Sequence, residues 1–251
     1  LGRWAWAAQA FCLAVVVLAL AAPLGVMAYW LINGVQQGET VRDVLAPLQR
    51  SLRAAAVAAG ASGLLALPFV FLEVRYPGWL SRIIARAAYV GYALPGVVVA
   101  LAFVFLGANA LSVLNDLVGL NSYRSFALLI AAYVVRFLAQ AVGPARAALL
   151  QVNPHLEESG LLLGRSRAHV FATVTLPLMR PGVIAGVALV FLTVMKELPV
   201  TLLLAPTGYD TLATRIWSAS SEAFYARAAA PALVLVALSA LSLVYVLEPD
   251  D

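Results

Sequence analysis

Six long apolar segments constrain the fold of this chain more than any other feature. They cover approximately residues 6–32, 52–72, 87–106, 126–150, 182–204 and 228–247. About 20 apolar residues in a helix cross the hydrocarbon core of a bilayer. Lipid offers no partners to backbone N–H and C=O groups, so spanning segments of this length form helices. The sequence therefore predicts an all-α polytopic membrane protein with about six transmembrane helices, built as a single domain over residues 1–251.

The charge content supports the same class of protein. Only 11% of the residues are charged and 63% are hydrophobic, whereas soluble domains carry about 25% charged residues. The net charge of +4 does not indicate a nucleic-acid partner, because membrane proteins concentrate Arg in cytoplasmic loops that face anionic lipid. With the N-terminus in the cytoplasm, the inner loops hold eight Arg residues and the outer loops six. This orientation is the one we expect.

Charged residues also occur inside two of the apolar segments. Arg136 lies in the fourth segment, and Lys196 and Glu197 lie in the fifth. Each costs about 2.5–3.5 kcal/mol at the centre of a membrane helix, so such groups face the protein interior and pair. Adjacent helical residues point about 100° apart, so Glu197 is predicted to meet Arg136 rather than Lys196. The pair either fixes helix packing or belongs to a polar translocation path or gate.

Prolines predict breaks in two segments. Pro199 interrupts the fifth segment just after the charged residues, and Pro95-Gly96 can break the third. The carbonyl groups freed by a break must line protein or water. Pro199 therefore joins Arg136, Lys196 and Glu197 among the candidate residues of a translocation path.

A polar insert, residues 157–177, separates the fourth and fifth apolar segments. Asn153-Pro154 is a helix start, because Asn caps and Pro fits the first helical position. Gly164 ends that helix, since Gly tolerates the left-handed conformation. Ser166 can cap a second helix, which Pro177 is expected to stop. Residues 153–177 are thus predicted to form two short helices across the membrane face, where a partner can dock.

The insert resembles the cytoplasmic loop of inner-membrane subunits of binding-protein-dependent ABC importers. That loop reads E-A-A-x-x-x-G, nine residues, then I-x-L-P. This chain has Glu158-Ser159-Gly160, three residues, Gly164, nine residues, and Val174-Thr175-Leu176-Pro177. In the family this loop is the coupling helix, which sits in a cleft of the ATPase. The resemblance implies ATPase coupling through the following residues: Glu157, Glu158, Ser159, Gly160, Gly164, Leu176 and Pro177.

Further segments are similar to the ferric-iron branch of this importer class. They are Lys196–Leu204, Gly208–Trp217, Tyr92–Leu101 and Ala132–Phe137. The resemblance covers about residues 50–247. It implies a type I ABC importer permease in the bacterial inner membrane, working by alternating access. It also implies three partners, namely a cytoplasmic ATPase dimer, a periplasmic substrate-binding protein and a second permease half, which in many iron permeases is fused. Thiamine, polyamines and phosphonates remain alternative cargoes.

Several chemistries have no motif in this sequence. A P-loop needs a Gly-Lys-Ser/Thr run, but the only lysine, Lys196, is followed by glutamate. ATP and Mg are therefore expected on the partner ATPase, and this chain is expected to bind no cofactor. His155, His169 and Cys12 stand alone, so no metal site is predicted. Two alternatives from other classes are an intramembrane enzyme and a non-transporting scaffold. The sequence shows no set of catalytic residues that would favour the enzyme.

Overall fold

The computed structural model describes residues 2–38, 44–110 and 125–247, and these are helical apart from short connections. Two of the elements, η3 and η4, are π-helical turns. In chain order the elements are η1 (Gly2–Trp4), α1 (Ala5–Gln36), α2 (Leu45–Arg75), α3 (Trp79–Ala93), α4 (Gly96–Phe105), η3 (Leu106–Ala110), α6 (Phe126–Gln151), α7 (Pro154–Leu162), α8 (Arg167–Val170), η4 (Phe171–Thr175), α9 (Leu176–Met195), α10 (Pro199–Leu204), α11 (Leu212–Ser221) and α12 (Tyr225–Leu247).

The helices confirm an all-α membrane fold. Four described helical stretches are long and apolar enough to cross a bilayer: α1, α2, α6 and the continuous stretch Arg167–Met195. A bent pair, α3 with the helix that follows it, makes a fifth span if it is counted as one. The sixth predicted segment corresponds to α12.

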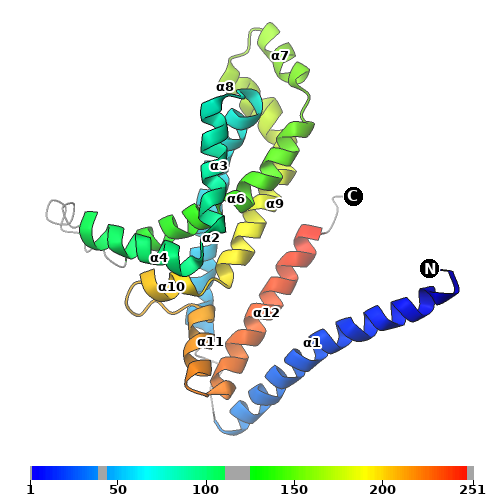
Figure 1. Cartoon of the computed structure of the whole chain (residues 1–251), viewed down its shortest axis with the longest axis vertical. Helices are drawn as coiled ribbons and strands as arrows, with labels where there is room; N and C mark the ends of the chain where they lie inside the picture. The colour runs from blue at the N-terminus through cyan, green and yellow to red at the C-terminus, as the bar shows by residue number, and fades with distance from the viewer. Residues whose placement is uncertain (1, 39–43, 111–124, 248–251) are drawn as a thin grey trace.

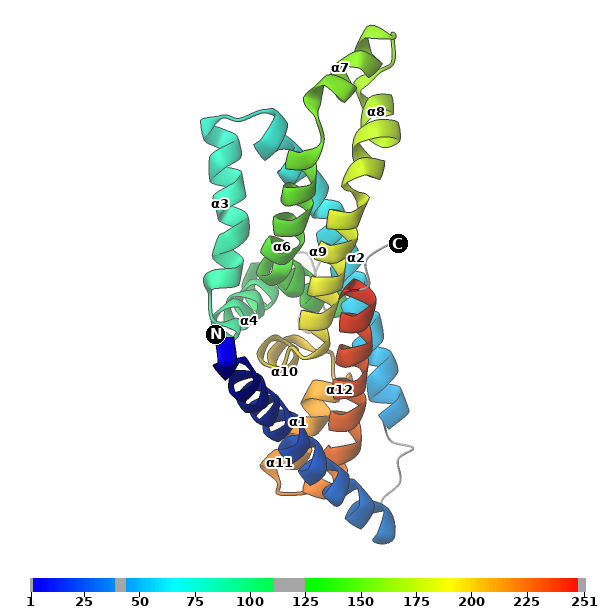
Figure 2. The same cartoon turned by 90° about the vertical axis from the view of Figure 1, so that its right-hand side faces the viewer.

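The third predicted span is not a straight helix. Its two halves, Trp79–Ala93 and Gly96–Asn109, meet at an angle of 105°. Leu94 is extended, with φ −77° and ψ 141°, because the ring of Pro95 disfavours the helical conformation in the preceding residue. Figures 1 and 2 show α3 running down from the side of the bundle that carries α7, while α4 runs across the bundle.

The core of the molecule is formed where α2, α6 and α9 pack together (Figure 2). Small residues allow this close approach. Ala55 and Ala58 of α2 are fully buried. A Cβ atom on Gly186 of α9 would lie 2.7 Å from the carbonyl oxygen of Ala141 on α6. Glycine is therefore required where these two helices cross, as expected for helices that associate through small residues in a membrane.

Helix α1 lies apart from this core and packs mainly on α12 (Figure 1). None of its most apolar 18-residue window is buried in the molecule. Phe11 and Leu18 are each 69% exposed. Apolar side chains of this kind suit a helix whose surroundings are lipid or another membrane subunit.

The end of the bundle away from α7 is tied by polar contacts between α2 and the loop before α11. Arg50 Nη1 donates to the carbonyl oxygen of Gly208 at 2.6 Å, and the Tyr209 hydroxyl donates to the carbonyl oxygen of Arg50 at 2.8 Å. Ser51 Oγ accepts from the backbone N–H of Leu212. Partial burial raises the pKa of Tyr209 despite the opposing effect of nearby Arg50.

Candidate functional site

The loop between α6 and α9, residues 153–175, contains the predicted caps and turn. Asn153 Oδ1 accepts from the backbone N–H of His155 at 3.0 Å and caps α7. Gly164 has φ +76° and forms the predicted turn. Ser166 Oγ then accepts from the N–H of His169 and caps α8. We call residues 153–175 the coupling segment.

The predicted stop at Pro177 is wrong. Helix α8 passes through the π-helical turn η4 directly into α9, so the second helix of the coupling segment is continuous with a membrane span. A proline inside a helix clashes with the carbonyl group four residues earlier. Here that carbonyl belongs to Thr173, which lies in the widened turn. The π-helical turn thus accommodates Pro177 and allows the helix to continue.

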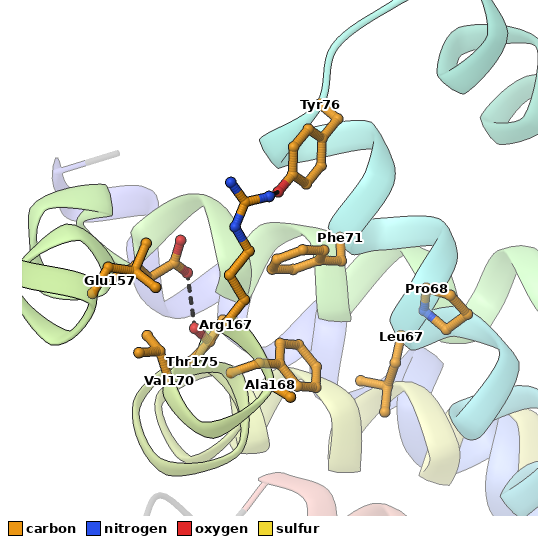
Figure 3. Close-up of a pocket in the computed structure, with 11 residues that line it drawn as sticks. Leu67, Pro68, Phe71, Tyr76, Glu157, Arg167, Ala168, Val170 and Thr175 are labelled. Carbon is orange, nitrogen blue, oxygen red and sulfur yellow. Dashed lines mark hydrogen bonds between the residues drawn. The ribbon is translucent and has the colours of Figure 1, made fainter. Parts of the chain in front are cut away.

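Glu157 ties the coupling segment to the membrane core. Arg75, the last residue of α2, donates from Nε to Glu157 Oε2 at 3.0 Å and from Nη2 to Oε1 at 3.1 Å. Thr175 Oγ1 donates to Glu157 Oε1 at 2.8 Å, as Figure 3 shows. Arg75 also donates to the carbonyl oxygen of Val152. The Glu157 carboxylate therefore connects α7 to the end of α2 and to the start of α9, while Arg75 itself also reaches the end of α6.

Glu158 points away from this contact. Its side chain is 64% exposed and lies 2.9 Å from Nδ1 of His155. Ser159 donates to the carbonyl oxygen of His155 within the same helix. Gly160 faces α8, because a Cβ atom there would lie 2.8 Å from Cγ2 of Val170. The small residue predicted at position 160 is therefore explained by the packing of α7 against α8.

Two leucines are exposed at the tip of the coupling segment. Leu162 is 89% exposed and Leu163 is 81% exposed, just before the Gly164 turn. Further along, Leu176 packs against the core, whereas Pro177 is exposed. The segment thus has one face bound to the bundle by Glu157 and another that presents two leucines.

A pocket of about 470 Å³ separates the coupling segment from the end of α2 (Figure 3). Its walls are mainly apolar and include Phe71 of α2 and Phe171 of η4. The two rings meet edge to face, with 5.3 Å between their centroids. Arg167 crosses the gap and donates to the Tyr76 hydroxyl at 3.2 Å. The coupling segment is therefore held to α2 at a few points rather than packed along its length.

The second candidate site lies in the middle of the bundle, where Arg136 and Glu197 meet. Nη1 of Arg136 lies 3.5 Å from Oε1 of Glu197, and the side chains are 19% and 9% exposed. This confirms the pairing expected from the sequence. A Cβ atom on Gly96 would overlap the Arg136 guanidinium group. The break between α3 and α4 thus provides the space in which Arg136 lies.

The break between α9 and α10 is also anchored to α6. Glu197 Oε1 accepts from the N–H of Val200 at 3.3 Å, and Thr201 donates to the carbonyl oxygen of Glu197 at 2.6 Å. The Tyr133 hydroxyl is hydrogen-bonded to Thr201 Oγ1. Pro199 begins α10 as expected for a helix start. Lys196 ends α9 and is exposed, away from the buried pair.

Sequence reasoning placed a break at Gly96 but did not identify four other residues of these two sites: Arg75, Thr175, Tyr133 and Thr201. A signal existed for Tyr133, which precedes Arg136 by three residues and therefore shares its helix face. Arg75 and Thr175 gave no such signal, because their partner lies far away in the sequence. Among the described residues, no group of three or more His, Cys, Asp or Glu side chains could hold a metal ion.

Comparison with known proteins decides the family. A family model described as "binding-protein-dependent transport system inner membrane component" matches residues 61–250. The chain belongs to this family. It is therefore a multi-pass inner-membrane protein, and the relatives that follow are transport permeases rather than enzymes.

Two relatives of this family member illustrate its branch. The chain is 36% identical over 227 residues to the Fe(3+)-transport system permease protein FbpB 2 of Haemophilus influenzae, covering 90% of this chain and 43% of the relative. It is 28% identical over 183 residues to a putative 2-aminoethylphosphonate transport system permease protein, PhnU, of Salmonella choleraesuis, covering 69% of this chain and 63% of the relative. The chain thus spans less than two thirds of the length of either.

Solved structures show the same fold. A bacterial alginate ABC transporter, in complex with an alginate pentasaccharide-bound periplasmic protein, matches with a TM-score of 0.71 and 16% identity, covering 96% of this chain and 92% of that one. An amino acid ABC transporter matches with a TM-score of 0.55 and 17% identity, covering 86% of this chain and 93% of that one. These likenesses place the helices in the fold of ABC importer permeases.

Proposed function

We propose that this chain forms one half of the translocation pathway of an ATP-driven importer that carries ferric iron across the bacterial inner membrane. The Haemophilus relative, named for Fe(3+) transport, matches 90% of the chain and supports the iron cargo. Because the chain covers 43% of that relative, a second permease half, fused or separate, completes the pathway. A periplasmic binding protein delivers the cargo, and the N-terminus and coupling segment lie in the cytoplasm.

The division of the coupling segment into two faces carries this proposal. Leu162 and Leu163 offer an apolar surface to a cytoplasmic ATPase dimer, which binds ATP and Mg. On the opposite face, Glu157 is bonded to Arg75 and Thr175. A displacement of α7 is therefore passed to the ends of α2 and α9. Closure of the ATPase dimer would turn the cavity outward, and hydrolysis would return it inward, as in alternating access by rigid-body movement.

Cysteine crosslinking tests the docking of the ATPase. The single native cysteine, Cys12, is first replaced with Ser. Leu162→Cys then places a thiol at the exposed tip of the coupling segment. Leu64→Cys is the matched control, because Leu64 is 72% exposed on the membrane span α2. A crosslinker with one maleimide and one photoreactive group, attached to the thiol through the maleimide, should join Leu162→Cys, and not Leu64→Cys, to the co-purified ATPase.

Two results would contradict the proposal. If Leu162→Cys forms no crosslink with an ATPase present in the assembly, the coupling segment has another role, such as that of a scaffold. If the assembly is crosslinked and hydrolyses ATP but imports 2-aminoethylphosphonate and no iron, the importer function stands and the cargo is wrong. The 28% identity to phosphonate permeases is the observation that favours this second cargo.

A further inference from the structure

We propose that the cargo crosses this half of the pathway as an anion, and that Lys196 is the residue that selects for it. The anion is either an oxyanion itself or a ferric ion enclosed by anionic ligands. This inference rests on the proposed import function and specifies the charge of what is carried. Four observations support it, namely the depth of the charged site, the exposure of Lys196, the placement of the acids and the charge balance.

The charged site lies at the middle of the membrane. Arg136 follows Phe126, the first residue of α6, by ten residues and precedes Arg146 by ten residues. Arg146 is paired with Glu73 among the charged residues near the coupling segment. At 1.5 Å per residue, each of these distances is about 15 Å, half of a hydrocarbon core of about 30 Å. Glu197 contacts Arg136, so Lys196 lies near the same depth.

Lys196 is exposed at this depth, and its side chain has no hydrogen bond or ion pair with the described residues. An ammonium group facing lipid near the bilayer centre is strongly disfavoured, so intramembrane charges face a water-filled cavity or another protein surface. Lys196 stands at the break between α9 and α10, where the freed backbone must likewise face protein or water. Both constraints direct this side chain toward the pathway.

Most acidic residues in the described part of the chain lie at the two ends of the bundle, and only one lies at its middle. Six acids lie in the described part of the chain: Glu73, Glu157, Glu158, Glu197, Asp210 and Glu222. The first three belong to the end with the coupling segment, and the last two flank α11 at the opposite end. Only Glu197 among these six lies at the level of Lys196, and Arg136 already neutralises it.

Counted over the described residues, Arg136, Lys196 and Glu197 give the mid-membrane site of this half one net positive charge. It would repel a bare trivalent cation and attract an anion, and this effect is strong where low-dielectric walls surround the path. Ferric iron favours several hard oxygen ligands, and the described residues contain no cluster that supplies them. Ligands that travel with the ion would meet this need. The three N–H donors of Lys196 would then bind an oxyanion or the outer oxygens of such a complex.

The charge on the cargo can be measured with the complete importer in proteoliposomes. The assembly contains the partner half, the ATPase and the binding protein. One arm offers ⁵⁵Fe³⁺ with an excess of ¹⁴C-citrate, so that the iron is present as an anionic complex with two citrates, and the other offers ¹⁴C-2-aminoethylphosphonate without iron. We expect either co-entry of ¹⁴C with ⁵⁵Fe or uptake of the phosphonate. In both cases the transient current on a solid-supported membrane should have the sign of anion entry.

Variants of Lys196 assign the effect to this residue. Lys196→Glu should lower uptake by about tenfold or more, within the range in which charged clefts enrich their ligands, and Lys196→Arg should restore most of it. Lys196→Gln, which removes the charge without reversing it, should also lower uptake. Arg180→Gln is its control and should leave uptake unchanged, because Arg180 is exposed near the other end of α9. Size-exclusion chromatography verifies that each variant assembles.

The outcomes separate this inference from the function on which it rests. Entry of ⁵⁵Fe without ¹⁴C, with a current of cation sign, would overturn the anionic cargo. Equal uptake by assembled Lys196→Glu and wild-type importers would overturn the role of Lys196. ATP hydrolysis without ATP-dependent uptake of either cargo would instead overturn the proposed importer function itself.

Discussion

Nε of Arg75 lies 3.0 Å from Oε2 of Glu157, although 82 residues separate them in the sequence. Arg75 is the last residue of a membrane span, and Glu157 lies in the first turn of α7. Their side chains are 13% and 16% exposed, so solvent screens the pair only partly. This contact joins the coupling segment directly to the end of α2.

A double-mutant cycle at Arg75 and Glu157 measures how strongly the two residues interact. Glu157→Gln removes the charge that two donors of Arg75 and the hydroxyl of Thr175 share. We expect a loss of about 1–3 kcal/mol in the free energy of unfolding, and a coupling free energy with Arg75→Gln well above zero. Thermal unfolding in detergent gives the stability, and ATP-driven uptake should fall in both single variants.

Glu158→Gln is the stability control for this cycle, because Glu158 is 64% exposed. Its effect on unfolding should remain within about 0.5 kcal/mol. Equal destabilisation by Glu157→Gln and Glu158→Gln would show that the contact with Arg75 contributes nothing specific.

Gly164→Ala is expected to destabilise the turn of the coupling segment by about 1 kcal/mol, because φ at Gly164 is +76° and a Cβ atom disfavours this conformation. Gly60→Ala in α2 is the matched control, since neither glycine has an atom within 4 Å of the Cβ that would be added. Gly60 is helical, so its variant should be neutral or slightly stabilising. Limited proteolysis of the coupling segment and uptake assays compare the two variants. Equal cleavage rates and equal uptake in Gly164→Ala and Gly60→Ala would refute a role for the backbone conformation at Gly164.

Gly96→Ala is expected to displace Arg136, because the added Cβ atom would overlap its guanidinium group. The ion pair with Glu197 would then be lost in the membrane interior, and overpacking of this kind costs about 1–3 kcal/mol. Gly143→Ala on α6, which has open space around it, is the control. Melting temperature in detergent and uptake should both fall for Gly96→Ala only. Unchanged stability would show that Arg136 has another position available.

The hydrogen bonds of Thr201 predict that Thr201→Val destabilises the protein more than Tyr133→Phe does. Thr201 donates its only proton to the carbonyl oxygen of Glu197, so Tyr133 must be the donor in the bond between the two hydroxyls. Tyr133→Phe removes one hydrogen bond and should cost about 1 kcal/mol. Thr201→Val also leaves the buried Tyr133 hydroxyl without its partner and should cost more, about 2 kcal/mol. The reverse order in thermal unfolding would refute this assignment of donors.

Local chemistry in the sequence predicted much of the site. The caps at Asn153 and Ser166 and the turn at Gly164 depend on residues within three positions of each other, and all three are confirmed. The stop at Pro177 was also a local inference, and it is wrong. It failed because the π-helical turn before Pro177 relieves a clash that a regular α-helix cannot.

The sequence by itself determined that this chain spans a membrane, that its spans are helical and that a polar coupling segment precedes α9. These properties follow from the free energy of transferring apolar segments from water to lipid and from the capping of helix ends, both of which depend on residues close together in the sequence. Only the tertiary structure decided that Glu157 rather than Glu158 faces the core, that Arg75 is its partner and that Gly96 makes room for Arg136. Adjacent residues on a helix differ by about 100° in direction, and which of them is buried depends on helices that are distant in the chain.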